Sequence, residues 1–90
     1  MSVYVDCAQN SFRRMKMCHM IADTPEELHQ MAERIGMRRE WFQRKSFPHY
    51  DVAKFRRSVA VEYGAIECDR RTFVQHLRRI RECGAFSHLR

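Results

Sequence analysis

The chain has 90 residues, of which 44% are hydrophobic and 31% are charged, and its net charge at neutral pH is +6. This length allows a single domain, and the composition excludes an intrinsically disordered chain. No apolar run approaches the roughly 20 residues of a membrane-spanning helix, and the first residues do not resemble a secretory signal, so we expect a cytoplasmic protein without membrane contact.

The positive charge is concentrated in the C-terminal part of the chain. Residues 1–37 contain four Lys and Arg against five Asp and Glu, whereas residues 38–90 contain thirteen against six. This asymmetry favours a polyanionic partner: a nucleotide, a nucleic acid or an acidic protein surface. The alternative is that the arginines are solvated and serve solubility.

The N-terminal part predicts two extended segments and then a helix. Residues 2–6 are β-forming and end in Asp6, and the polar stretch that follows, through Asn10 and Ser11, predicts a loop. Residues 15–20 predict a second strand, although their methionines also fit a helix. Thr24 then provides an N-cap hydroxyl with Pro25 at the first helical position. Apolar residues recur at helical spacing from there to Gly36, where the helix should end.

Two further helices are predicted in the basic part. Asp51 is expected to cap a helix that ends at Gly64, and Asp69 to cap another that ends at Gly84. Residues 38–47 fit either a short helical turn or an extended connector, and residues 65–68 predict a short strand.

This order of elements predicts an α/β fold, with a small parallel or mixed three-stranded sheet packed against three main helices. Residues 1–84 should form a single globular domain, and residues 85–90 a short C-terminal tail. If the sheet is parallel, ligands should bind at the carboxyl ends of its strands. The four cysteines show no CxxC spacing, so we expect buried, reduced thiols rather than disulfides or zinc ligands.

Polar side chains follow the predicted strands and suggest a candidate site. Two histidines with several carboxylates suit a divalent metal, or a general acid/base pair acting on a phosphate ester. We predict His49, Asp51 and Asp6 as catalytic residues, and His19, His49 and Asp6 as metal ligands. His19, Asp23 and Tyr50 are further predicted to contact a ligand. The alternative is that Asp51 is a simple helix cap and that His49 is a turn residue.

Basic and aromatic residues predict a second feature, a surface for phosphates. Arginines neutralise phosphates and aromatic faces stack on bases, so Arg57 and Trp41 are candidate ligand contacts. The alternative is that Trp41 and Phe42 are core residues anchoring the 38–47 connector. The basic surface is predicted to consist of Arg70, Arg71, Arg78, Arg79 and Arg81.

Several segments together resemble an uncharacterised family, the domain of unknown function 4031, whose members are short proteins of bacteria and phages. They are residues 3–6, 18–23, 27–29, 41–43, 49–52 and 64–65. The family has no established activity, but its motif contains polar residues that match here, Gln43 among them, and this implies a site. Members often have a second acidic residue where this chain has Cys7, so the resemblance does not imply a carboxylate pair at this position. Phage membership implies a host-directed or anti-defence role.

The leading hypothesis is that the protein binds a phosphate-bearing ligand, a nucleotide or a nucleic acid, at the His/Asp cluster and acts as a metal-dependent phosphoesterase. The alternative is a phage-type interaction module that inhibits or modulates an acidic host protein through its arginine-rich face. A third hypothesis is a homodimer assembled through Trp41 and Phe42.

Overall fold

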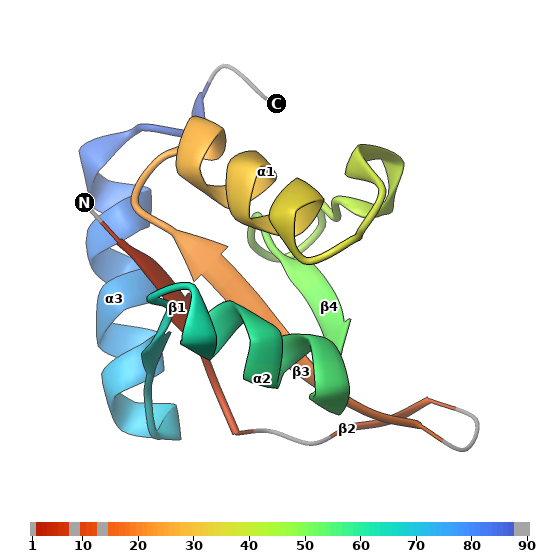
Figure 1. Ribbon diagram of the computed structural model, residues 1–90. Helices are drawn as coiled ribbons and strands as arrows, with labels where there is room; N and C mark the ends of the chain where they lie inside the picture. Colours follow the sequence, from red (N-terminus) through yellow and green to blue (C-terminus); the bar gives the residue numbers. More distant parts are fainter. Residues whose placement is uncertain (1, 8–9, 13–14, 88–90) are drawn as a thin grey trace.

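The computed structural model describes residues 2–7, 10–12 and 15–87 (Figure 1). The strands are β1 (Val3–Val5), β2 (Asn10–Phe12), β3 (Met15–Ala22), β4 (Tyr50–Ala53) and β5 (Ile66–Glu67). The helices are α1 (Pro25–Arg34), α2 (Lys54–Glu62) and α3 (Arg70–Cys83), with a 3-10 turn, η1, at Arg39–Trp41. The α/β class and the three main helices are therefore confirmed.

The long strand β3 organises the sheet. β1 and β2 pair with it antiparallel along one edge, since Val5 lies opposite Met20 and Asn10 opposite Met17. β4 pairs antiparallel with its other edge, and β5 adds to β1 in parallel. The sheet is therefore mixed and four strands wide, because β1 and β2 occupy one position end to end. The prediction of three strands was wrong because it missed β2 and β4.

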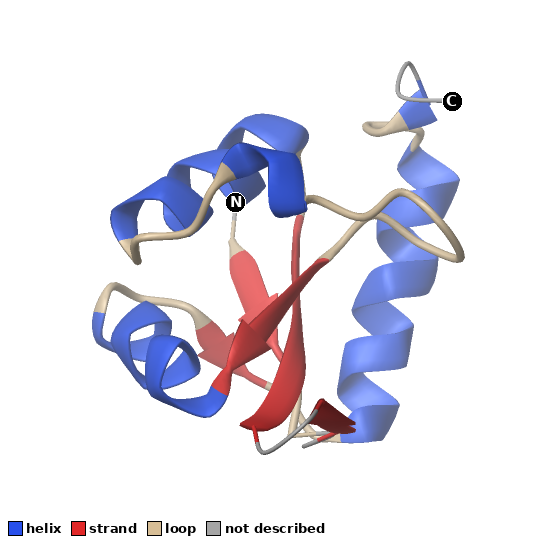
Figure 2. Ribbon diagram, turned by 90° about the vertical axis from the view of Figure 1, so that its right-hand side faces the viewer, coloured by secondary structure: helices blue, strands red, loops and turns tan. Residues whose placement is uncertain are grey.

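Helices cover both faces of the sheet, with α1 and α2 on one side and α3 on the other (Figure 2). Successive side chains of a strand point to opposite faces. Met20 of β3 accordingly belongs to the core under α1 and α2, whereas its neighbour Ile21 packs with Phe73 and Ile80 of α3. By the same alternation, His19 points toward the α3 side.

Two of the three predicted helix caps are confirmed. The Thr24 hydroxyl accepts a hydrogen bond from the Glu27 backbone N, and the Asp69 carboxylate accepts one from that of Thr72. The predicted cap at Asp51 is wrong, because residues 50–53 are strand and α2 begins after Ala53. Val52 is fully buried in that strand, and this burial outweighs the local capping preference.

The cysteine prediction holds in part. All four thiols are free, but Cys18 and Cys68 are buried, whereas Cys7 and Cys83 are exposed.

Within the described part of the chain, no helix has the length and apolar character needed to cross a membrane. Beyond the left-handed Gly84 that ends α3, Phe86 packs against the core.

Candidate functional site

The pairing of β3 with β4 places His19 directly opposite Asp51. The backbone N and O of His19 point the other way, toward Asp6. His19 and Asp51 are therefore a non-hydrogen-bonded pair, in which the side chains of two antiparallel strands come closest. The register of these strands thus builds the first half of the site.

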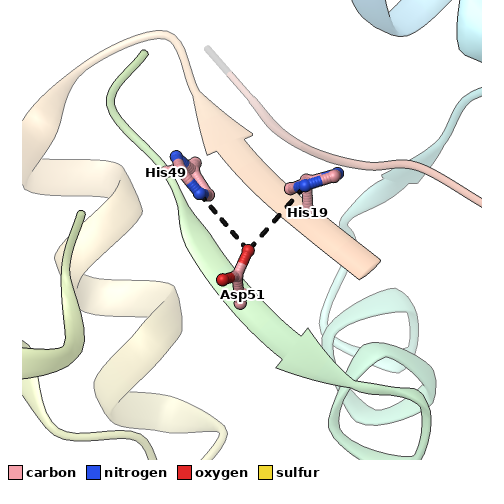
Figure 3. Close-up of side chains that lie close together, drawn as sticks. All are labelled: His19, His49 and Asp51. Carbon is pink, nitrogen blue, oxygen red and sulfur yellow. Dashed lines mark ion pairs between the residues drawn. The ribbon is translucent and has the colours of Figure 1, made fainter. Parts of the chain in front are cut away.

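His49 completes a group of three side chains on the same face (Figure 3). It precedes Asp51 by two residues and therefore shares its side of β4. The Asp51 Oδ1 atom lies 3.8 Å from His19 Nε2 and 3.3 Å from His49 Nε2. One potential ligand atom from each residue lies within 4.8 Å of the others, so the three side chains converge on one point.

Hydrogen bonds fix the orientation of both imidazoles. His19 Nδ1 lies 2.7 Å from Asp6 Oδ2, and His49 Nδ1 lies 2.8 Å from the Phe47 carbonyl oxygen. A carbonyl and a carboxylate accept hydrogen bonds, so each Nδ1 carries a proton and donates it. Each Nε2 atom is thereby turned toward Asp51, as outer carboxylates and carbonyls orient the histidines of metal centres.

Asp6 performs this role because β1 ends there. Its backbone N still donates to the His19 carbonyl at 3.1 Å, but its Oδ1 accepts from the His19 backbone N at 2.7 Å, where a strand would offer a carbonyl. The buried Asp6 carboxylate therefore binds His19 through both the backbone and the ring. This contact raises the pKa of His19 above its ordinary value, although partial burial of the ring opposes the shift.

Gln43 orients the third member of the group. Its backbone forms an isolated bridge with His49 on the outer edge of β4. From there its Nε2 atom donates to Asp51 Oδ2 at 2.5 Å, while Oδ1 faces the two histidines. Asp51 is thus held in one orientation, like the two imidazoles.

Aromatic rings enclose the group on one side and leave it open on another. Phe47 stacks on His49 with ring centroids 4.3 Å apart, and lies edge-on to His19 at 5.7 Å. Phe73 of α3 also contacts the His19 ring. The Asp51 side chain is 37% exposed, against 9% for His49. Solvent or a ligand can therefore reach the three side chains from the side of the Asp51 carboxylate.

Two imidazole nitrogens and one carboxylate oxygen suit a borderline divalent metal. Such a set, with further coordination positions left open, is typical of catalytic zinc and non-haem iron centres. The triad of His19, His49 and Asp51 differs from the sequence-based metal set, in which Asp6 stood in place of Asp51. The expected capping role of Asp51 concealed its position in a strand. The signal available in the sequence was the spacing of His49 and Asp51, two residues apart, which places both on one strand face.

Other predicted ligand residues lie outside this group. Tyr50 points to the opposite face of the sheet, is fully buried and hydrogen-bonds His29 Nδ1 at 2.6 Å. Trp41 is 47% exposed, so it is not the core anchor considered as an alternative, whereas the neighbouring Phe42 packs on the core. Arg57 donates a hydrogen bond to the backbone carbonyl of Asp6 and therefore helps to hold Asp6, the partner of His19, in place.

The predicted basic surface divides into two parts. Arg70, Arg71 and Arg78 are exposed and line a shallow groove along α3. Arg79 instead pairs with Asp23 at 2.8 Å, and Arg81 donates to the Ser46 carbonyl. These arginines all lie outside the triad itself.

Asp23 is engaged in a structural network rather than in the triad. Its carboxylate accepts hydrogen bonds from the Ser2 backbone N, the Tyr4 hydroxyl and Arg79. Burial alone would raise the pKa of Asp23, but these hydrogen bonds outweigh it and hold the pKa below the ordinary 3.8.

A carboxyl with a lowered pKa stabilises the fold above its unfolded-state pKa and loses this contribution as pH falls through the folded-state value. We therefore expect the stability difference between wild type and Asp23→Asn to be constant near neutral pH and to shrink below about pH 4. Urea denaturation at a series of pH values measures this. Glu62→Gln, on the exposed surface of α2, is the control. A difference that does not change with pH would contradict the assignment.

Comparison with known proteins gives one family. A family model described as "Protein of unknown function (DUF4031)" matches residues 3–80. Neither the curated proteins nor the solved structures contain a match to this chain. The matched segment includes every member of the triad and its hydrogen-bonding partners. The chain therefore belongs to the DUF4031 family of proteins of unknown function, as the resemblance of its segments predicted.

Proposed function

We propose that the protein binds a divalent transition metal through His19, His49 and Asp51 and hydrolyses a phosphate ester of a nucleotide or nucleic acid there. The observation that carries the proposal is the convergence of two Nε2 atoms and one carboxylate oxygen. Each is held by a hydrogen bond from outside the group.

Electrostatic repulsion among the three ligand atoms favours a cation at their centre. Because both Nδ1 atoms donate, the Nε2 atoms of neutral imidazoles direct lone pairs at Asp51 Oδ1. Three electron-rich atoms that face one another repel unless a positive charge lies among them. A proton on one imidazole satisfies one pair of atoms, whereas a metal ion satisfies all three at once.

The donor set also selects the kind of metal. Mg²⁺ and Ca²⁺ prefer sites made of oxygen atoms alone, whereas imidazole favours Zn²⁺, Fe²⁺, Co²⁺ or Ni²⁺. Two imidazoles in a group of three therefore favour a transition metal such as Zn²⁺.

Three protein ligands leave coordination positions for water and substrate. A divalent metal supplies a Lewis acid for a phosphoryl oxygen and makes water a better nucleophile near neutral pH. The protein's part is to fix the tautomer in which both Nδ1 atoms carry the proton, to aim both Nε2 atoms through Asp6 and the Phe47 carbonyl, and to exclude bulk water with the Phe47 ring. The excess of basic residues in the C-terminal part supports an anionic substrate.

We expect Zn²⁺ or Co²⁺ at about 100 times its Kd to stabilise the wild-type protein by roughly 2.7 kcal/mol. His49→Ala and Asp51→Asn should lose most of this stabilisation, because each removes one of the three ligands. Metal-dependent hydrolysis of bis(p-nitrophenyl) phosphate should be lost with it. Thermal unfolding with and without metal measures the first effect.

The matched control is His76→Ala. His76 stacks on Tyr4 at 4.0 Å and lies outside the triad, so this variant should respond to metal like the wild type. Equal metal stabilisation of all four proteins would contradict the proposed centre, and a metal response without hydrolysis would contradict the proposed reaction.

A substitution of Gln43 tests whether its hydrogen bond to Asp51 contributes to metal affinity. Outer-shell partners typically contribute 10–100-fold to metal affinity. Gln43→Ala should therefore weaken Co²⁺ binding about tenfold while all three ligands remain, as measured by titration of the Co²⁺ absorption bands. Arg38→Ala is the control, since Arg38 is an exposed residue of the same connector. Unchanged affinity in Gln43→Ala would show that Asp51 needs no such support.

A further inference from the structure

A cavity of about 460 Å³ lies beside the triad, between the segment 42–48 and the C-terminal end of α3. The segment reaches across to α3 (Figure 2). There Arg81 donates a hydrogen bond to the Ser46 carbonyl. Ser46 adopts a left-handed conformation, with φ of 66°, at this crossing. The cavity is thus closed at one point by a contact between two segments far apart in the chain.

The polar side chains around the cavity are positively charged or neutral. Arg44, Lys45 and Arg81 contribute to its lining, and no Asp or Glu does. Among the described residues, none of these three cations forms an ion pair with a carboxylate, whereas Arg57 and Arg79 both do. The charge of the cavity is therefore not neutralised from within and favours an anion.

Three phenylalanines form most of the apolar lining of the cavity, together with Pro48 and Ile80. Phe42, Phe47 and Phe86 contribute to its lining, and each is half-buried with its inner side packed against the core. Rings fixed in this way offer flat surfaces on which a planar group can stack.

We propose that this cavity binds a nucleoside monophosphate unit, with the base against the phenylalanine rings and the phosphate beside Arg44, Lys45 and Arg81. The volume lies within the range of about 300–1,000 Å³ that is usual for sites of small ligands and cofactors. Inorganic phosphate alone would leave the aromatic surface unused, and an uncharged aromatic ligand would leave the three cations without an anionic partner.

The cavity adjoins the triad through one side chain. Phe47 lines the cavity and also stacks on His49, so a nucleotide held there lies next to the proposed metal centre. As a statement about the substrate, this inference rests on the proposed function. Binding to the cavity needs no metal, however, and is tested separately.

The experiment is isothermal titration of the metal-free protein with AMP, adenosine, inorganic phosphate and the dinucleotide ApA. AMP should bind more tightly than adenosine or phosphate. Titration with ApA, whose phosphate joins two nucleosides, tests whether the cavity accepts a nucleotide unit of an oligonucleotide as well as the free nucleotide. Arg44→Gln/Lys45→Gln should weaken AMP binding about tenfold or more, since hydrogen bonds with charged groups are lost. Phe86→Leu, which keeps the apolar volume but removes the ring, should weaken it about fivefold.

The matched control is Arg70→Gln/Arg71→Gln, which removes the same charge from α3 outside the cavity lining and should bind AMP like the wild type. Equal loss in both double variants, or no AMP binding by the wild type at millimolar concentration, would overturn the proposal. AMP binding that persists in Asp51→Asn supports the cavity even if metal binding fails. Metal binding without AMP binding would refute the cavity alone.

Discussion

The register between β3 and β4 is the constraint on which the site depends. It sets His19 opposite Asp51 in a non-hydrogen-bonded pair, and the alternation of β4 then adds His49 to the same face. A shift of one residue would turn His49 and Asp51 toward α1 and α2 and would move Tyr50 and Val52 out of that core to the α3 side. The site and the core therefore require the same register.

The segment His49-Tyr50-Asp51 shows how one strand serves both purposes. Tyr50 is fully buried, and its hydroxyl is 2.6 Å from His29 Nδ1 on α1, so it fixes the strand from within. Burial lowers the pKa of His29, which keeps that imidazole neutral in the core. The two flanking side chains then point to the opposite face of the sheet, on the α3 side, in fixed positions. A strand anchored in this way offers a more precise scaffold for a metal than a loop does.

Much of the fold was predictable, because caps and apolar periodicity are local signals. Thr24, Asp69 and the three terminating glycines mark the helices, and the mixed α/β class follows from the order of elements. The strands β2 and β4 were missed because their signal is not local. Asp51 before an apolar run resembles a helix cap, and only its pairing with β3 makes it a strand residue.

The candidate site was predicted as a set of residues but not as an arrangement. The sequence grouped Asp6, His19, His49 and Asp51, and the structure brings all four together. The sequence alone does not show which carboxylate faces both Nε2 atoms. This depends on where β1 ends and on which strand pairs with β3 beside His19. The role of Gln43 depends in the same way on a bridge across the outer edge of β4.

A crystal structure of the protein loaded with Co²⁺ or Zn²⁺, with anomalous scattering data collected at the metal edge, would show directly whether His19, His49 and Asp51 bind the metal. We expect one strong anomalous peak within about 2.0–2.2 Å of His19 Nε2, His49 Nε2 and an Asp51 carboxylate oxygen. In that structure Asp6 should remain hydrogen-bonded to His19. A loaded crystal without a peak at this position, or a peak held by Asp6 in place of Asp51, would contradict the proposed metal centre.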